Sequence, residues 1–206
     1  MAMAETTVHV DSAGTSIAPP ATAVPSTIVP LPGIPVVVAV LGGLVVAIAT
    51  NKLWALDFFH VMGGALWTGI DLFVGLIIGP ILRRMSVQAR VEFSSRFMPK
   101  MLLLMPTLVI VTLASGFQLA RQFGNLSSSA PLHPWIVASF VVVGVLTLIA
   151  IGVLEPANLA VLFELRKPRP NGELIGRLMR RFVMSAGIIG AAQVATLVIM
   201  TKLASG

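Results

Sequence analysis

The sequence contains no cysteine, and charged residues make up only 11% of its 206 positions. Without cysteine, the chain has no disulfide bond, thiolate metal site or cysteine nucleophile. A soluble domain of this length carries roughly 25% charged residues because its surface must be solvated. Hydrophobic residues instead make up 56% of the chain, and the mean hydropathy is +0.95. The composition therefore predicts a protein that is solvated largely by a lipid bilayer.

The first 33 residues also lack lysine and arginine, and they are rich in Ala, Thr, Ser and Pro. A secretory signal peptide needs a basic start followed by an apolar run, and this segment has neither. Residues 1–33 are predicted to form an extended arm, because they have too few apolar groups for a core of their own. We expect other membrane-protein subunits to contact this arm, and we expect no role in the membrane for His9 within it.

Five apolar stretches follow the arm, and a helix that spans lipid needs about 20 residues. They predict an all-α fold: a polytopic transmembrane helical bundle with a four-helix core and one added N-terminal transmembrane helix. Residues 34–206 form this domain, with helices at about 34–50, 54–82, 98–120, 134–154 and 182–203. The first stretch is short and rich in valine, so it either crosses the membrane or lies in its interface.

Basic residues are concentrated in and around the connections after the second and fourth helices, which hold eleven of the fourteen Lys and Arg residues. The positive-inside bias places this side in the cytoplasm of a bacterial inner membrane. The N-terminus is then cytoplasmic and the C-terminus periplasmic; if the first stretch stays in the interface, the arm is periplasmic instead. The net charge of +6 therefore reflects loops, and no nucleic-acid partner is expected.

Five residues of the second helix follow spacings of 3, 4, 3 and 4, which place them on one helix face. Ionisable groups inside a span are costly and usually face the bundle interior. We interpret this face as a cofactor seam, in which His60 is a metal or heme ligand and Asp57 orients it. The alternative is a packing seam, in which His60 and Asp71 form hydrogen bonds with neighbouring helices. The seam residues are Asp57, His60, Gly64, Trp67 and Asp71.

Three further polar residues lie in or beside the spans. His133, at the predicted start of the fourth helix, is either a second cofactor ligand or a solvated loop histidine. Glu155 precedes a proline, so it is either a proton site at a kink or an interfacial partner of Arg166 or Arg181. Gln193, in the last helix, is interpreted with Thr196 as forming interhelical hydrogen bonds.

The second and third predicted helices carry a short pattern of residues. It consists of His60-x6-Trp67-x-Gly69 with Arg83-Arg84, then Met98-Pro99, Pro106 and Ser115-Gly116. This pattern resembles a superfamily of integral membrane proteins that includes the HemJ-type protoporphyrinogen oxidases, the CopD-type copper-resistance proteins and related uncharacterised membrane proteins. The resemblance covers roughly residues 53–203, and it implies a four-helix bundle that holds heme b with His60 as the iron ligand.

One position departs from the HemJ-type pattern. That pattern has a lysine near the start of the helix that corresponds to residues 134–154, and this stretch contains no Lys or Arg. We therefore do not expect protoporphyrinogen oxidation. A second heme ligand would be His133 or a methionine; otherwise the iron is five-coordinate.

The residues and the resemblance together lead us to expect an integral membrane subunit of a larger complex, not an enzyme by itself. In this interpretation the subunit binds heme b at His60 and supports electron transfer. One alternative is a purely structural or accessory subunit without a cofactor. A further alternative is copper or proton transport that involves Asp71 and Glu155.

Overall fold

Every regular element of the computed structural model, which describes residues 30–205, is a helix. Apolar segments in lipid favour this outcome, because each backbone polar group must find its partner within the segment. The predicted arm and its subunit contacts fall almost entirely on residues 1–29, as does His9, and so lie outside the described residues. The elements are η1 (Leu31–Gly33), α1 (Ile34–Thr50), α2 (Leu53–Phe73), η2 (Val74–Ile78), α3 (Gly79–Arg84), α4 (Val87–Gln122), α5 (His133–Ile149), η3 (Ala150–Leu154), α6 (Glu155–Leu165) and α7 (Gly172–Ser205).

Within residues 30–205, five helical stretches are long and apolar enough to cross a membrane, which confirms the predicted polytopic bundle. Several of these helices are longer than the apolar stretches from which they were predicted. Helix α4 begins at Val87 instead of near residue 98, because the Ser86 hydroxyl caps it by accepting a hydrogen bond from the Ala89 N–H at 3.2 Å. Its 36 residues extend roughly 54 Å, beyond a hydrocarbon core of about 30 Å. The spans are Leu31–Thr50, Leu53–Arg84, Val87–Gln122, His133–Leu165 and Gly172–Ser205.

Two of the spans contain a five-residue π-helical turn just before a proline. Element η2 ends two residues before Pro80, and η3 ends two residues before Pro156. Proline has no N–H, and its ring clashes with the carbonyl one turn earlier, so the helix widens locally to place it. Glu155, at the predicted kink, is therefore the first residue after a π-helical turn.

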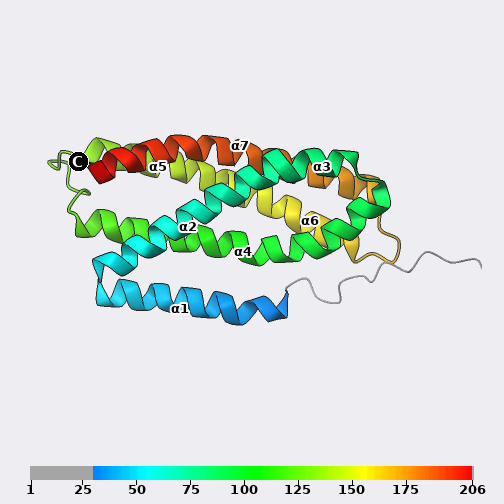
Figure 1. Ribbon diagram of the computed structural model, residues 1–206, viewed down its shortest axis with the longest axis horizontal. Coiled ribbons are helices and arrows are strands. Elements are labelled where there is room, and N and C mark those ends of the chain that lie inside the picture. Colours follow the sequence, from blue (N-terminus) through cyan, green and yellow to red (C-terminus); the bar gives the residue numbers. More distant parts are fainter. Residues whose placement is uncertain (1–29, 206) are drawn as a thin grey trace, which may run out of the picture.

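The main hydrophobic core lies between the four spans that follow α1. Its buried residues come from α2 and η2, α3, α4, the α5–α6 span and α7, and none comes from α1. Helix α1 packs on α2 and α4 through Leu44 and Ala47, its only buried residues. The predicted four-helix core with one added N-terminal helix is therefore confirmed. Figure 1 shows α1 at the edge of the bundle, with α2 crossing diagonally over α4.

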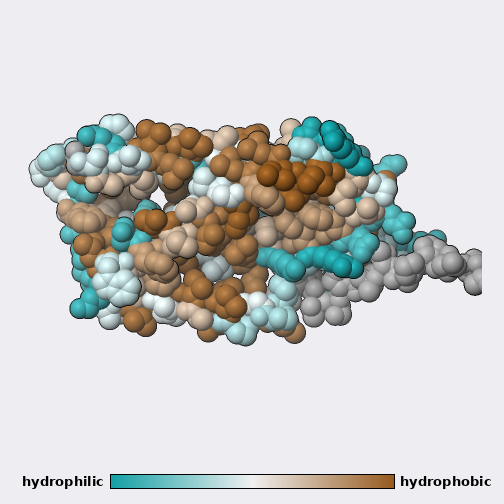
Figure 2. Space-filling view, in the orientation of Figure 1, coloured by the Kyte–Doolittle hydropathy of each residue, from teal (hydrophilic) through white to brown (hydrophobic). Residues whose placement is uncertain are grey.

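The connections gather at two ends of the bundle (Figure 1). The α3–α4 and α6–α7 connections form one end, which we call the basic end because eleven of the fourteen Lys and Arg residues lie in or beside them. The α1–α2 and α4–α5 connections and the end of α7 form the other, which we call the α1–α2 end. The side-chain surface between the ends is largely apolar, and polar residues gather toward both ends (Figure 2). Exposed apolar side chains such as Trp54 and Leu148 suit contact with lipid.

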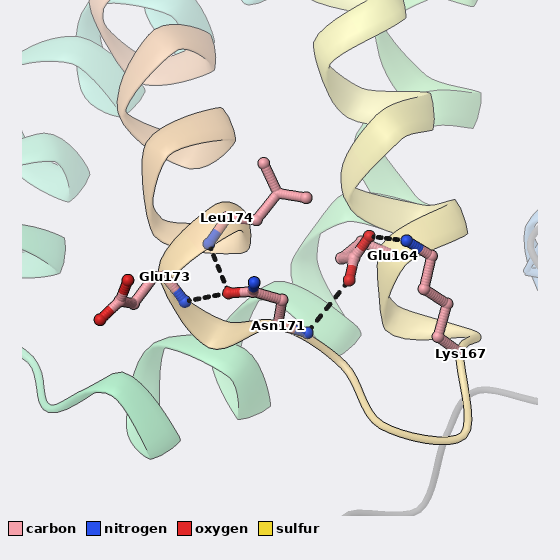
Figure 3. A network of polar contacts seen from close by, with 5 residues as sticks. All are labelled: Glu164, Lys167, Asn171, Glu173 and Leu174. Carbon is pink, nitrogen blue, oxygen red and sulfur yellow. Dashed lines mark hydrogen bonds and ion pairs between the residues drawn. The ribbon is translucent and has the colours of Figure 1, made fainter.

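The α6–α7 connection is held by a small polar network (Figure 3). The buried Glu164 carboxylate accepts hydrogen bonds from the Lys167 ammonium at 2.5 Å and from the Asn171 N–H at 3.1 Å. The Asn171 side-chain oxygen accepts from the N–H groups of Glu173 and Leu174, at 3.1 and 3.0 Å. Asn171 therefore caps the first turn of α7 while Glu164 ties the connection to α6.

Candidate functional site

His60 lies on α2 at its crossing with α4. Its ring nitrogen Nδ1 is 3.0 Å from the backbone carbonyl oxygen of Thr112. A carbonyl oxygen can only accept, so Nδ1 carries a proton and donates it. In the neutral ring the lone pair is then on Nε2, which is the usual arrangement of a metal-bound histidine held through its other nitrogen. The bundle therefore leaves Nε2 as the ring nitrogen of His60 that carries a lone pair.

Two glycines, one on each helix, allow this contact. A Cβ on Gly63 would lie 2.7 Å from the Thr112 hydroxyl oxygen, so α2 and α4 approach closely there. A Cβ on Gly116 would lie 2.6 Å from Cε1 and 2.8 Å from Nδ1 of His60. The imidazole therefore lies directly against the α4 backbone. The sequence pattern did not identify Thr112 as the partner, because a backbone carbonyl leaves no side-chain signature. The only signal in the sequence is that Thr112 and Gly116, which are both small, lie four residues apart on α4.

Asp57 lies near the α1–α2 end and is exposed. Its side chain makes no hydrogen bond with any residue in the described range. The Nδ1 atom that Asp57 was expected to orient is instead bonded to Thr112, because the glycine contacts bring α4 close to the ring. The orientation of His60 therefore depends on α4.

The other end of the seam lies inside the bundle. Trp67 and Asp71 are 3% and 1% exposed, and they lie one turn apart on the same face of α2. Gly64 is half-buried, and a Cβ there would make an ordinary 3.6 Å contact with the Thr112 methyl group. The seam from His60 to Asp71 therefore faces other helices, as its spacing predicts.

His133 is the first residue of α5, and its Nδ1 lies 3.2 Å from the Asn125 carbonyl oxygen. By the same argument as for His60, Nδ1 is the donor. The two histidines share no hydrogen bond, and each is held by a different segment of the chain. His133 therefore anchors the start of α5 to the preceding loop.

Three polar residues in the spans, Glu155, Gln193 and Thr196, lack side-chain partners that the sequence suggested for them. Glu155 is half-buried, and the ion pairs of the described residues are Arg96–Glu92 and Lys167–Glu164, so Glu155 pairs with neither candidate arginine. The side-chain oxygens of Gln193 and Thr196 are buried without a partner in the described range. The hydrogen bonds expected from these two oxygens are therefore not formed among the described residues.

An apolar pocket of about 320 Å³ lies between α1 and the start of α2. Lys52 is its only charged lining residue, and His60 is not part of the lining. The pocket therefore suits an apolar group with an anionic end more than a bare ion. Its lining residues are Gly43, Val46, Ala47, Thr50, Lys52, Trp54, Ala55, Phe58 and Phe59.

The candidate centre is thus a single imidazole. Within residues 30–205, no group of three or more His, Cys, Asp or Glu side chains is placed to hold a metal ion. A lone histidine fits a metal that brings its other ligands with it, as the iron of a porphyrin does. Comparisons with models of protein families, with curated protein sequences and with solved structures find no match to this chain.

Proposed function

We propose that this chain is a subunit of a larger membrane complex that binds heme b through His60 and supports electron transfer. The observation that carries the proposal is the Nδ1 hydrogen bond of His60 to the Thr112 carbonyl, which leaves Nε2 free for iron. His60 would hold the group through Nε2, and the close contact with Gly116 would keep the ring in place. When bound, heme b supplies one-electron transfer between the ferric and ferrous states of its iron.

The presence of a single histidine at the site favours heme over a bare copper ion as the cofactor. A bare copper ion needs several protein ligands, and the described part of the chain does not group them around His60. Heme leaves only one or two axial positions for the protein. His133 is held by the loop before α5 and shares no hydrogen bond with His60, so we propose one protein ligand, His60, for the iron.

Helix α1 supports the assignment to a larger complex. Only Leu44 and Ala47 of its 17 residues are buried, and it adds nothing to the main core. Its outer face carries Val36, Val38 and Val45, which are all more than half exposed. A helix that contributes so little to its own bundle is suited to contact another transmembrane subunit. The same observation favours the second candidate function, an accessory subunit without a cofactor.

We place the basic end in the cytoplasm of a bacterial inner membrane, with the C-terminus in the periplasm. The support is the clustering of eleven basic residues at one end of the bundle and the positive-inside bias. His60 then lies in the periplasmic half.

An absorption spectrum of the protein purified in detergent tests the heme proposal. We expect a Soret band that is lost in His60→Ala and kept in the matched variant His133→Ala, since the His60 ring is the one that lies against α4. Each variant is first checked for a monodisperse elution profile. A wild-type protein that is folded but colourless after expression with excess heme would contradict the proposal.

The native mass in mild detergent tests the complex separately. We expect the chain to migrate with other subunits when it is extracted from its own membrane. A solitary species that is stable and carries heme would remove the complex from the proposal and leave the heme. A colourless chain within a complex would support the accessory function instead.

A further inference from the structure

Asp71 is a buried acid on α2. It is 1% exposed, and it lies one turn after Trp67, which is 3% exposed. Its second carboxyl oxygen, Oδ2, has no hydrogen-bond partner among the described residues. A carboxyl oxygen buried without a donor carries a full desolvation cost, which is largest when the group is ionised.

No side chain at membrane depth supplies a compensating positive charge. Residues 101–120 of α4, 134–154 of α5 and η3, and 182–201 of α7 contain no Asp, Glu, His, Lys or Arg. On α2 itself, the titratable groups are His60 and Asp57, three to four turns away, and on the α5–α6 span the first titratable residue after η3 is Glu155. An ionised Asp71 would therefore be a buried charge without a counter-charge.

Helix α7 runs antiparallel to α2 beside this acid. A Cβ on Gly79 would contact Val183, and one on Gly190 would lie 2.8 Å from the Leu72 nitrogen and 3.1 Å from the Asp71 carbonyl carbon. Residue numbers thus rise along α7 as they fall along α2. Gln193 and Thr196 lie one and two turns beyond Gly190, toward the end of the bundle where α2 begins.

These two residues extend the line of unsatisfied oxygen atoms that begins at Asp71. Gln193 is 4% exposed and its Oε1 has no partner in the described range, and neither has the Thr196 Oγ1. Together with Asp71 Oδ2, they are the buried side-chain oxygens and nitrogens of the described residues that lack a partner. Gln193 and then Thr196 on α7 therefore form a line of polar side chains that leads from Asp71 on α2 toward the α1–α2 end.

The other side of Asp71 is closed. Toward the basic end, Gly75 and Gly187 lie backbone against backbone, and a Cβ on Gly79 would be 2.6 Å from a Val183 methyl. The intervening Val74 is 2% exposed. The α2–α7 crossing there has neither space nor an unsatisfied polar group.

From this asymmetry we propose that Asp71 is a proton-binding site that exchanges its proton only with the α1–α2 end, along Gln193 and Thr196. Protonation transfers a proton from a hydronium ion to the Asp71 carboxylate, which leaves a neutral acid and a water molecule. The neutral acid removes the uncompensated charge and gains an O–H that can donate to an oxygen acceptor. The site is independent of heme, because it depends only on the packing of α2 and α7.

Infrared spectroscopy of the protein in lipid vesicles tests the protonation. At neutral pH, we expect the carbonyl band of a protonated carboxyl group, and we expect it to be absent in Asp71→Asn. Glu173→Gln removes an exposed acid and serves as the matched control that keeps the band. If Asp71→Asn does not fold, carboxyl-labelled aspartate in the wild type gives the same answer, since the chain has only Asp11, Asp57 and Asp71.

Two results would overturn the proton site. One is an aspartate signal that shows only ionised carboxylates at neutral pH. The other is a band that disappears when sodium ions are added at constant pH, which would make sodium the occupant.

Cysteine accessibility tests the one-sided path, and the absence of native cysteine removes any background. We expect Thr196→Cys to react with a small, charged thiol reagent added at the α1–α2 side and not with reagent added at the basic side. Ile189→Cys is the control for a closed position, because Ile189 lies two turns nearer the basic end of α7 and is fully buried in the apolar core, and it should not react from either side. Reaction of Thr196→Cys from the basic side, or equal reaction of both variants, would refute the path.

Discussion

Gly75 of η2 and Gly187 of α7 lie so close that a Cβ built on Gly75 would overlap the Gly187 Cα. Gly79 against Val183 and Gly190 against Leu72 continue the same contact along both helices. Lipid removes the hydrophobic drive between helices, so close packing through small residues becomes a main source of association. This crossing sets the rotation of α2, and therefore the direction in which Asp71 and His60 face.

The first prediction is that Gly75→Ala destabilises the bundle by about 1–3 kcal/mol, the usual cost of overpacking a tight interface. The added methyl meets backbone atoms of Gly187, which cannot move aside as a flexible side chain would. Gly187→Ala should cost less, since its Cβ would lie 3.1 Å from the Gly75 Cα. Unfolding of the purified protein in mixed micelles measures the order of the two effects.

Gly69→Ala is the matched control for this series. Gly69 is exposed on α2, and a Cβ there would meet nothing within 4 Å. Alanine is the better helix former by about 1 kcal/mol, so this variant should be neutral or slightly more stable. Equal destabilisation by Gly69→Ala and Gly75→Ala would show that helix propensity, and not the crossing, determines the result.

The second prediction concerns the cap of α7. Asn171→Ala removes the acceptor for the N–H groups of Glu173 and Leu174 and should cost about 1 kcal/mol. Asn171→Ser keeps an oxygen acceptor at the same position and should retain most of the stability. Backbone amide exchange of the first turn of α7 measures the effect locally. No difference in exchange between the alanine and serine variants would contradict the capping role.

The sequence predicted the helices and their interior face because both leave a pattern in side chains. Apolar runs marked the spans, and the spacing from His60 to Asp71 marked the buried side of α2. Helix ends were harder, since α4 continues through the polar residues that follow Ser86, where hydropathy gives no signal. The Thr112 carbonyl that bonds His60 was also beyond prediction, because every residue carries the same backbone group and only the packing selects one.

Asn158 illustrates a second contact that the sequence did not predict, between a side chain on α6 and the backbone of α4. In the orientation that satisfies its amide, the nitrogen donates to the Met98 carbonyl at 3.2 Å and the oxygen accepts from the Leu102 N–H at 3.1 Å. The Met98 carbonyl and the Leu102 N–H are separated by one turn of α4. The Asn158 side chain therefore joins α6 to the α4 backbone.

The third prediction follows from this contact. Asn158→Leu keeps the approximate volume but leaves α6 without a hydrogen bond to α4, and it should cost about 1–3 kcal/mol. Thr147→Ala is the matched control, because the Thr147 hydroxyl bonds only to the Val143 carbonyl of its own helix, at 2.8 Å. Unfolding in mixed micelles compares the two. A smaller loss for Asn158→Leu than for Thr147→Ala would mean that the amide does not join the helices.

The fourth prediction rests on the proposed heme site and leaves its ligand intact. Gly116→Ala adds a methyl 2.6 Å from Cε1 of His60, so the imidazole must rotate or move away from α4. This movement weakens the Nδ1 hydrogen bond to Thr112 that orients the ligand, and we expect a shifted Soret band and a lower ratio of heme to protein. Gly69→Ala, which adds the same methyl to open space on α2, should leave both unchanged. A normal spectrum and heme content in Gly116→Ala, together with loss of heme in His60→Ala, would show that His60 binds iron without the help of α4.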